Sequence, residues 1–345
     1  MTNALSVLQD NQEIELKLTL EAHQAVAFKR LMARRRVAPT THNLLTRYFD
    51  TPDFALGDLG VALRIRRVGR RWIQTLKREG DRQGGLSVRA EYESPLRANM
   101  LDLARFPAEA LAHIPRSLIQ ELAPMFETRF TRTAWLIRTR SGATIEVALD
   151  VGEIRAGTRV QALCEVELEL KSGRADALLD VALALTQRVS MLPFDTSKAE
   201  RGMQLARGVE AVPARASVIK LSRNMTVEEG FAAICGTCLA QFQANLPGVL
   251  RDDDPEYLHQ ARVALRQLRA ALRLFRHVCP LTEIELQHSL RNWVAAMGPV
   301  RDWDVLCVET LPAIAPHFAS RRHGHILPMP QKRNGKMHDR QCGPP

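Results

Sequence analysis

Charged residues occupy every second position in several short segments of the chain, and this alternation limits the folds open to it. Successive side chains of a β-strand point to opposite faces, so the segment EIELK places Glu13, Glu15 and Lys17 on one face and its apolar residues on the other. The same spacing gives one charged face to five further segments: Arg64 with Arg66, Thr75 with Lys77, Arg89 with Glu91 and Glu93, Glu146 with Asp150, and Glu165 with Glu167 and Glu169. These segments are predicted to be strands.

The charged faces have two interpretations. On an open antiparallel sheet they would meet water, which is the ordinary arrangement for a single strand. Exposed faces normally mix Lys, Glu, Thr, Ser and Gln, whereas here acidic sets and basic pairs lie on different strands. We therefore expect the sheet to close, with the charges inside and the apolar residues outside beneath helices. Buried charges need partners of opposite charge. We therefore expect the interior to bind a ligand that carries both negative and positive charge, such as a phosphate chain with a divalent metal.

The two signs of charge suit different parts of such a ligand. Mg²⁺ and Mn²⁺ prefer carboxylate oxygens, so the predicted metal ligands are the acidic residues Glu13, Glu15, Glu165, Glu167 and Glu169. Arginine holds phosphoryl oxygens with its bidentate fork, and lysine acts as a point charge. The predicted phosphate-binding residues are the basic residues Arg64, Arg66, Lys77 and Arg89.

The spacing of apolar residues predicts an α+β domain followed by an all-α domain. In the first domain we expect strands at 12–20, 44–50, 61–68, 71–78, 86–94, 128–139, 143–151 and 162–171, and helices at 21–35, 107–123 and 174–190. The Gly-Gly pair within 78–87 indicates a hairpin loop between antiparallel strands. The predicted bounds are a leader at 1–10, the strand-rich domain at 11–207, a linker at 208–217, the helical domain at 218–310 and a disordered tail at 311–345.

The overall charge favours polyanionic partners without choosing one. Lys and Arg number 48 against 38 Asp and Glu, so nucleic acid, acidic lipid and polyphosphate all stay open. No apolar run reaches the roughly 18 residues that a bilayer span needs, and the first residues lack the order of a secretory signal. Six scattered cysteines fit reduced thiols better than a disulfide framework. These features predict a cytoplasmic protein without a membrane partner.

The charged segments also follow the order of a known family. The chain resembles the CYTH superfamily, or triphosphate tunnel metalloenzymes, in EIELK at 13–17, YFDTPD at 48–53, LRIR at 63–66, TLK at 75–77, RAEYE at 89–93, EVALDVGEI at 146–154, EVELELKSG at 165–173 and SKAERG at 197–202. The resemblance covers residues 11–207. It implies a closed eight-stranded antiparallel β-barrel tunnel with flanking helices, which binds a triphosphate with divalent metal.

The resemblance implies roles for individual residues. It implies that the metal ligands are Glu13, Glu15, Glu165 and Glu167. It also implies that Lys17 or Lys198 assists proton transfer. The implied phosphate path runs along Lys17, Arg64, Arg66, Lys77, Arg89, Arg132, Lys198 and Arg201. The acids expected to position these basic residues or a second metal are Glu91, Glu146, Asp150 and Glu169. An exposed pair at a helix end is the alternative for Lys198 and Arg201.

A basic helix is predicted in LHQARVALRQLRAALRLFRHV, residues 258–278. One face of such a helix carries His259, Arg262, Arg266, Arg269, Arg273 and Arg276, and the other is apolar. The ordinary interpretation is that this basic face is a solvated surface. However, no acidic residue interrupts the row of basic residues, and like charges at this spacing repel, which favours a polyanionic or acidic partner. With RDWDV at 301–305, the region resembles half of a CHAD domain, a helical module that binds polyphosphate. The resemblance makes the polyphosphate contacts His259, Arg262, Arg266, Arg269 and Arg273.

These features favour an inorganic triphosphatase that hydrolyses tripolyphosphate to pyrophosphate and phosphate, joined to a partial CHAD module that binds long-chain polyphosphate. Thiamine triphosphatase and class IV adenylate cyclase are alternative activities of the same tunnel. A non-catalytic polyphosphate-binding protein is an alternative of another class, but it would not need inward acids. Nucleic-acid binding is disfavoured because no aromatic residues interleave with the basic stripe.

Overall fold

The computed structural model describes residues 12–219, 221–251, 254–277 and 284–318. The chain divides after Val294 into two compact units, and each is described by itself. The predicted leader and residues 319–345 of the predicted tail lie outside the described residues. None of the described helices is long and apolar enough to cross a membrane.

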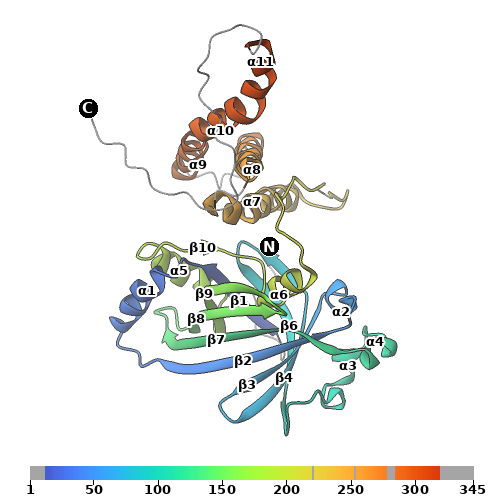
Figure 1. The fold of residues 1–345 in the computed structure, drawn as a ribbon. Helices are drawn as coiled ribbons and strands as arrows, with labels where there is room; N and C mark the ends of the chain where they lie inside the picture. Colours follow the sequence, from blue (N-terminus) through green and yellow to red (C-terminus); the bar gives the residue numbers. More distant parts are fainter. Residues whose placement is uncertain (1–11, 220, 252–253, 278–283, 319–345) are drawn as a thin grey trace, which may run out of the picture. The chain divides into compact units, whose positions relative to one another are not determined.

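Eight antiparallel strands close into a ring (Figure 1). Their order around the ring is β1, β9, β8, β7, β2, β3, β4 and β6, and residues 12–16 of β1 pair back with residues 86–90 of β6. The ring strands are β1 (Gln12–Thr19), β2 (Thr40–Asp50), β3 (Val61–Val68), β4 (Arg71–Arg78), β6 (Leu86–Leu96), β7 (Ala123–Arg138), β8 (Thr144–Ala156) and β9 (Arg159–Ser172). Two short strands, β5 (Asp81–Gln83) and β10 (Leu192–Pro193), pair with β6 and β1. The predicted closed eight-stranded barrel is confirmed.

The apolar faces of the strands point outward and are covered by helices. Ile14, Leu16 and Leu18 of β1 alternate with the charged residues and are at most 5% exposed. They belong to one core cluster with residues of α1 (Gln24–Ala33) and α5 (Asp176–Thr186). A second cluster joins β3 and β4 to α2 (Ala55–Asp58), α3 (Ala108–Leu111) and α4 (Arg116–Gln120). Burial of the outer face under helices leaves the charged faces inside, as the alternation predicted.

One apolar row lies on the inner side of the barrel. Leu44, Phe130 and Leu163 form a small buried cluster from β2, β7 and β9. Gly152 of β8 lies in register between Phe130 and Leu163. A Cβ at Gly152 would come within 2.6 Å of the Phe130 Cβ, so the side chain of Phe130 can take this position only because residue 152 is glycine.

Helix α6 (Lys198–Arg207) brings two predicted site residues to the barrel. Its start is fixed by a capping box, in which Glu200 N donates to Ser197 Oγ at 3.1 Å and Ser197 N donates to Glu200 Oε2 at 2.8 Å. Gly202 packs against Phe126 of β7, where a Cβ would lie 2.0 Å from the ring. This close approach and the cap set the direction in which Lys198 and Arg201 project.

Several predicted element bounds are wrong. The helix predicted at 107–123 is two short helices, α3 and α4, because Pro115 lacks the N–H and the space that a continuing helix needs. A 3₁₀ turn, η1, lies before them at Leu103–Arg105. The helix predicted at 174–190 ends at Thr186. Residues 311–318, assigned to the disordered tail, form α11.

After a segment without regular structure, the rest of the described chain is mainly helical. Residues 209–219 form neither helix nor strand, and the helices begin at Val227 instead of residue 218. They are α7 (Val227–Arg251), α8 (Pro255–Leu274), α9 (Ile284–Ala296), α10 (Gly298–Val305), a π-helical turn η2 (Leu306–Thr310) and α11 (Leu311–Phe318). The predicted all-α region after the barrel is confirmed.

Candidate active site

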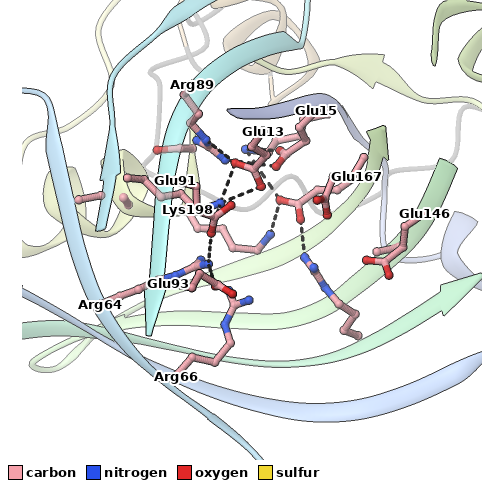
Figure 2. A pocket seen from close by; sticks show the side chains of 18 of the residues that line it. Glu13, Glu15, Arg64, Arg66, Arg89, Glu91, Glu93, Glu146, Glu167 and Lys198 are labelled. Carbon is pink, nitrogen blue, oxygen red and sulfur yellow. Dashed lines mark hydrogen bonds and ion pairs between the residues drawn. The ribbon is translucent and has the colours of Figure 1, made fainter. Parts of the chain in front are cut away.

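The charged strand faces enclose a cavity of about 520 Å³ inside the barrel (Figure 2). The predicted site residues that line it are Glu13, Glu15, Lys17, Arg64, Arg66, Lys77, Arg89, Glu91, Arg132, Glu146, Glu167, Glu169 and Lys198. Asp150, Glu165 and Arg201 are not on the cavity wall but are buried behind it. The sequence therefore identified the wall, but three residues assigned to it lie one layer deeper.

The densest set of charges surrounds the ammonium of Lys198. Its Nζ lies 2.7 Å from both Asp150 Oδ2 and Glu167 Oε1, and it also contacts Glu165 Oε1. Arg132 donates to Asp150 Oδ1 at 2.8 Å and contacts Glu167, and Arg201 donates to Glu165 Oε2 at 2.9 Å. Three carboxylates thus face three cations. Lys198 and Arg201 are an internal pair, and the exposed helix-end alternative is excluded by their burial.

Burial and ion pairing act in opposite directions on this cluster. Burial alone would lower the pKa of the Lys198 ammonium, but the facing carboxylates raise it above its ordinary value of 10.5. Burial would raise the pKa of the Glu167 carboxyl, but Lys198 and Arg132 hold it well below 4.5. Both groups are therefore charged at neutral pH.

A second set of contacts joins β1 to β4 and β6. Glu13 accepts a hydrogen bond from Lys77 Nζ at 2.8 Å and from Arg89 Nε at 2.7 Å. Arg89 also lies 3.2 Å from Glu15, and Lys77 lies 3.1 Å from Glu91. Although burial would raise the pKa of Glu13, these two cations hold it well below its usual range. Glu13 is consequently an ionised carboxylate already neutralised by protein groups.

An acid-rich row crosses the opposite strands. Glu15, Glu169 and Glu146 are in register on β1, β9 and β8. Burial raises the pKa of Glu15, and the charge of Glu167 raises it further. Burial also raises the pKa of Glu169, which has one ion-pair partner, Lys171, at 2.5 Å. In the described part of the chain no cation lies within 4.0 Å of Glu146, which stands apart from the dashed contacts in Figure 2.

The two arginines of β3 that line the cavity differ in their acidic partners. Arg64 lies 3.3 Å from Glu91 and 3.9 Å from Glu93, while its Nε has no hydrogen-bond partner among the described residues. Arg66 Nε donates to Thr46 Oγ1 at 3.1 Å, and no carboxylate of the described ranges lies within 4.0 Å of its guanidinium. Burial, with Arg64 and Arg132 adding to it, lowers the pKa of Arg66 to about 10. Among the described residues, the Arg66 cation thus has no carboxylate within ion-pair distance.

Some polar residues of the wall were not predicted as site residues: Gln12, Tyr48, Glu93, Lys171 and Ser197. Lys171 continues the alternation of β9 by two positions, so the same counting could have found it. Tyr48 stacks on Phe126 with ring centroids 4.7 Å apart. Burial would raise the pKa of the Tyr48 phenol, but Arg64 and Arg66 lower it. Nothing in the apolar segment around Tyr48 marks it as inward-facing.

One carboxylate grouping of the described residues fits a divalent metal ion. Oxygens of Asp150, Glu165 and Glu167 lie within 4.8 Å of one another, close enough to share one ion. Carboxylate oxygens are the ligands that hard divalent cations take, so the donor chemistry of this grouping fits such an ion. Glu15, Glu146 and Glu169 share a row across β1, β8 and β9 and add negative charge to the same cavity.

A family profile described as CYTH domain matches residues 11–203, more than half of the chain. The chain belongs to the CYTH family. The CYTH match contains all eight ring strands and every residue that lines the cavity. The predicted family is confirmed.

The relatives of the CYTH domain include named triphosphatases. An inorganic triphosphatase from Haemophilus influenzae is 35% identical over 202 residues, which are 56% of this chain and 55% of that protein. The chain therefore spans about half the length of that relative. Among solved structures, HpAC1 from Hippeastrum, for which a dominant triphosphatase activity is described, is 18% identical with a TM-score of 0.43. That comparison covers 58% of this chain and 98% of the Hippeastrum chain.

Beyond the CYTH domain, α8 is amphipathic as predicted. Leu258, Leu265, Leu268 and Leu272 are buried, whereas the basic face is exposed or partly exposed: His259, Arg262, Arg266, Arg269 and Arg273. Arg262 donates to the Val294 carbonyl at 2.7 Å. Within the described ranges, no carboxylate lies within 4.0 Å of the other arginines of this face.

A second profile, described as CHAD domain, matches residues 233–334. The match contains α8 and continues past residue 310, the bound predicted for this region. The CHAD domain from the plant Ricinus communis is 40% identical with a TM-score of 0.30, and the comparison covers 32% of this chain and 38% of that one. The predicted resemblance to CHAD domains is confirmed.

Proposed function

We propose that the CYTH domain is a metal-dependent triphosphatase that hydrolyses inorganic tripolyphosphate to pyrophosphate and phosphate. The observation that carries the proposal is Arg66, a cation on the cavity wall with no carboxylate of the described residues within 4.0 Å. A phosphate chain would supply the missing negative charge, and its bound metal would balance the acid-rich row of Glu15, Glu146 and Glu169. The name of the Haemophilus relative supports the same substrate.

The proposed metal is Mg²⁺ or Mn²⁺, which carboxylate oxygens favour. The residues that would hold it are Glu13, Glu15, Glu165, Glu167 and Glu169, supported by Glu91, Glu146 and Asp150. Such an ion, when bound, would neutralise phosphoryl oxygens as charge develops on them. Each of these five glutamates already has a protein cation within 4.0 Å, so a bound metal ion would share or displace those cations.

The basic residues of the wall would bind and orient the phosphate chain. They are Arg64, Arg66, Lys77, Arg89 and Arg132, with Arg201 acting from behind the wall through Glu165. Lys17 Nζ lies 3.7 Å from Glu15 and 4.0 Å from Glu167, too far for strong hydrogen bonds. Its ammonium is therefore proposed to donate a proton to the leaving phosphate. Phosphoryl transfer depends mainly on positioning and charge neutralisation, which such a wall supplies.

A phosphate-release assay tests the proposal directly. The purified chain would be given tripolyphosphate, thiamine triphosphate, ATP and long-chain polyphosphate, each with Mg²⁺, with Mn²⁺ and with chelator. We expect metal-dependent release that is fastest with tripolyphosphate. Faster release from thiamine triphosphate would assign that substrate instead, and cyclic AMP formed from ATP while tripolyphosphate stays intact would assign a cyclase.

A double substitution separates catalysis from binding. Glu13→Gln with Glu15→Gln removes two carboxylates from the cavity and leaves α8 untouched. Hydrolysis should fall by about 10²-fold or more, while the protein still binds long-chain polyphosphate. If the wild-type chain binds polyphosphate but releases no phosphate under any metal condition, the non-catalytic alternative is correct.

We also propose that the basic face of α8 binds long-chain polyphosphate. Its arginines lack carboxylates within 4.0 Å in the described part of the chain, so an extended polyanion would relieve their mutual repulsion. A cytoplasmic location is part of the same proposal, since the scattered cysteines favour a reducing compartment. Cell fractionation tests the location, and a titration with fluorescent polyphosphate at several salt concentrations tests the binding.

A further inference from the structure

One ammonium occupies the centre of a carboxylate grouping that also fits a divalent ion. Lys198 Nζ contacts Asp150, Glu165 and Glu167, whose oxygens lie within 4.8 Å of one another. A hard divalent cation takes the same kind of oxygen donors, at about 2.0–2.6 Å. Lys198 and a metal ion therefore require the same atoms.

The charges of this cluster are balanced before any metal binds. Asp150, Glu165 and Glu167 face the three cations Lys198, Arg132 and Arg201. A divalent ion added to this balanced set would leave excess positive charge in a buried place, which is costly without a compensating anion. The ion is accommodated at lower cost when one of the three cations leaves.

Lys198 is the cation best able to leave. Arg132 is fixed to Asp150 by two hydrogen bonds, at 2.8 and 2.7 Å, and Arg201 is fixed by Glu165 and by the Ala162 carbonyl at 2.8 Å. Lys198 lies on the cavity wall and carries its charge on a flexible four-carbon chain. It is also the first residue of α6, where the positive end of the helix dipole gives a cation no support.

We propose that Lys198 and a divalent metal ion exchange at the Asp150–Glu165–Glu167 triad. In the metal-free protein the ammonium fills the triad, and metal binding releases it into the cavity, where it binds the phosphate chain. The proposal rests on the proposed function for the identity of that anion. Because metal and phosphate chain favour the same released state of Lys198, each increases the affinity of the protein for the other.

The exchange predicts effects of opposite sign on two ligands. Lys198→Gln removes the competing cation, so the Mn²⁺ affinity of the substrate-free protein should increase by about tenfold at one site, measured by electron paramagnetic resonance of unbound Mn²⁺. The same substitution should decrease the affinity for tripolyphosphate, measured by calorimetry with Mn²⁺ present. An ordinary phosphate-binding lysine would give the decrease without the increase.

Two matched variants locate the effect. Lys198→Arg keeps the positive charge and should show the Mn²⁺ affinity of the wild type. Adding Asp150→Asn to Lys198→Gln removes one triad ligand and should abolish the increase. Equal Mn²⁺ affinity in the wild type and Lys198→Gln would overturn the proposal, as would an increase that persists with Asp150→Asn.

A measurement on the wild-type chain guards against a variant that does not fold. Reductive methylation of Lys198, followed by mass spectrometry, reports how accessible the ammonium is. Saturating Mg²⁺ without phosphate should increase the rate at Lys198 relative to Lys29, an exposed lysine of α1 that does not line the cavity. No change at Lys198 would contradict the exchange. Absence of phosphate release from any substrate would overturn the proposed function and leave the metal exchange standing.

Discussion

The barrel interior and the basic face of α8 both concentrate arginine, but they neutralise it differently. Inside the barrel, Arg89 and Arg132 each contact two carboxylates. On α8, no carboxylate of the described chain lies within 4.0 Å of Arg266 or Arg273. The barrel holds its charges in a fixed, internally balanced arrangement, whereas α8 depends on an external anion. The first arrangement suits selective binding and catalysis, and the second suits salt-sensitive binding of a long polyanion.

The largest expected effect comes from breaking the internal balance of the barrel. Glu165→Gln leaves Lys198 and Arg201 short of one buried carboxylate and should decrease the free energy of unfolding by about 3–5 kcal/mol, measured by urea denaturation. Glu153→Gln is the matched control, because the Glu153–Arg155 pair is open to solvent and its loss should leave the unfolding midpoint unchanged. Similar effects of the two substitutions would mean that the interior charges are not balanced as described.

Arg66 is the exception within the barrel, and its removal should affect activity without harming stability. Arg66→Gln should decrease kcat/KM for tripolyphosphate by about 10²-fold, because this cation is proposed to meet its counter-charge only in the substrate. The thermal midpoint should stay the same or rise, since a partly buried cation without a carboxylate is lost. A large loss of stability would place Arg66 with the balanced residues instead.

Two arginines of α8 test the other side of the comparison. Arg266→Ala with Arg273→Ala should decrease the affinity for long-chain polyphosphate by about tenfold at low salt and make binding less dependent on salt. Tripolyphosphate hydrolysis should be unchanged. Arg97→Ala with Arg116→Ala removes the same charge from exposed positions elsewhere and should change neither quantity. An equal loss in this control would show that only net charge matters.

The smallest expected effect is the acid dependence of barrel stability. The folded-state pKa of Glu167 is held well below 4.5, so its contribution to stability is present above that pH and is lost as pH falls through the folded pKa. The stability difference between the wild type and Glu167→Gln should therefore shrink by about 1 kcal/mol or more below pH 4.5 in urea unfolding series. A difference that is constant with pH would contradict the assigned ion pairs.

The alternation of charged and apolar residues along the strands was enough to predict which strand faces line the barrel interior. Because side chains alternate strictly, Glu13, Glu15 and Lys17 had to share a face, and the excess of charge predicted that this face is internal. The alternation does not predict how deeply each inward-facing side chain is buried. Glu165 and Glu167 share a face of β9, yet only Glu167 reaches the cavity, because Lys198 and Arg201 of α6 cover Glu165. That contact joins distant parts of the chain and has no local signature.

Local chemistry explains the errors in element bounds. The apolar spacing of 107–123 resembles that of a helix, but Pro115 interrupts it and the last residue already belongs to β7. The π-helical turn at Leu306–Thr310 carries the chain on into α11, so the helices do not end at residue 310. Tyr48 lies on the wall because β2 is paired with β3 and β7, a neighbourhood that the segment alone does not specify.

The closure of the ring by β1 has a consequence for how the proposed activity would appear during folding. β1 pairs with β6 on one side and β9 on the other, so its neighbours come from distant points of the chain. Contacts of such long sequence separation form slowly in folding. Since β1 carries Glu13, Glu15 and Lys17, a chain in which this strand has not yet docked lacks part of the cavity wall. The recovery of phosphate release during refolding should therefore follow the docking of this one strand and lag behind the formation of the outer helices.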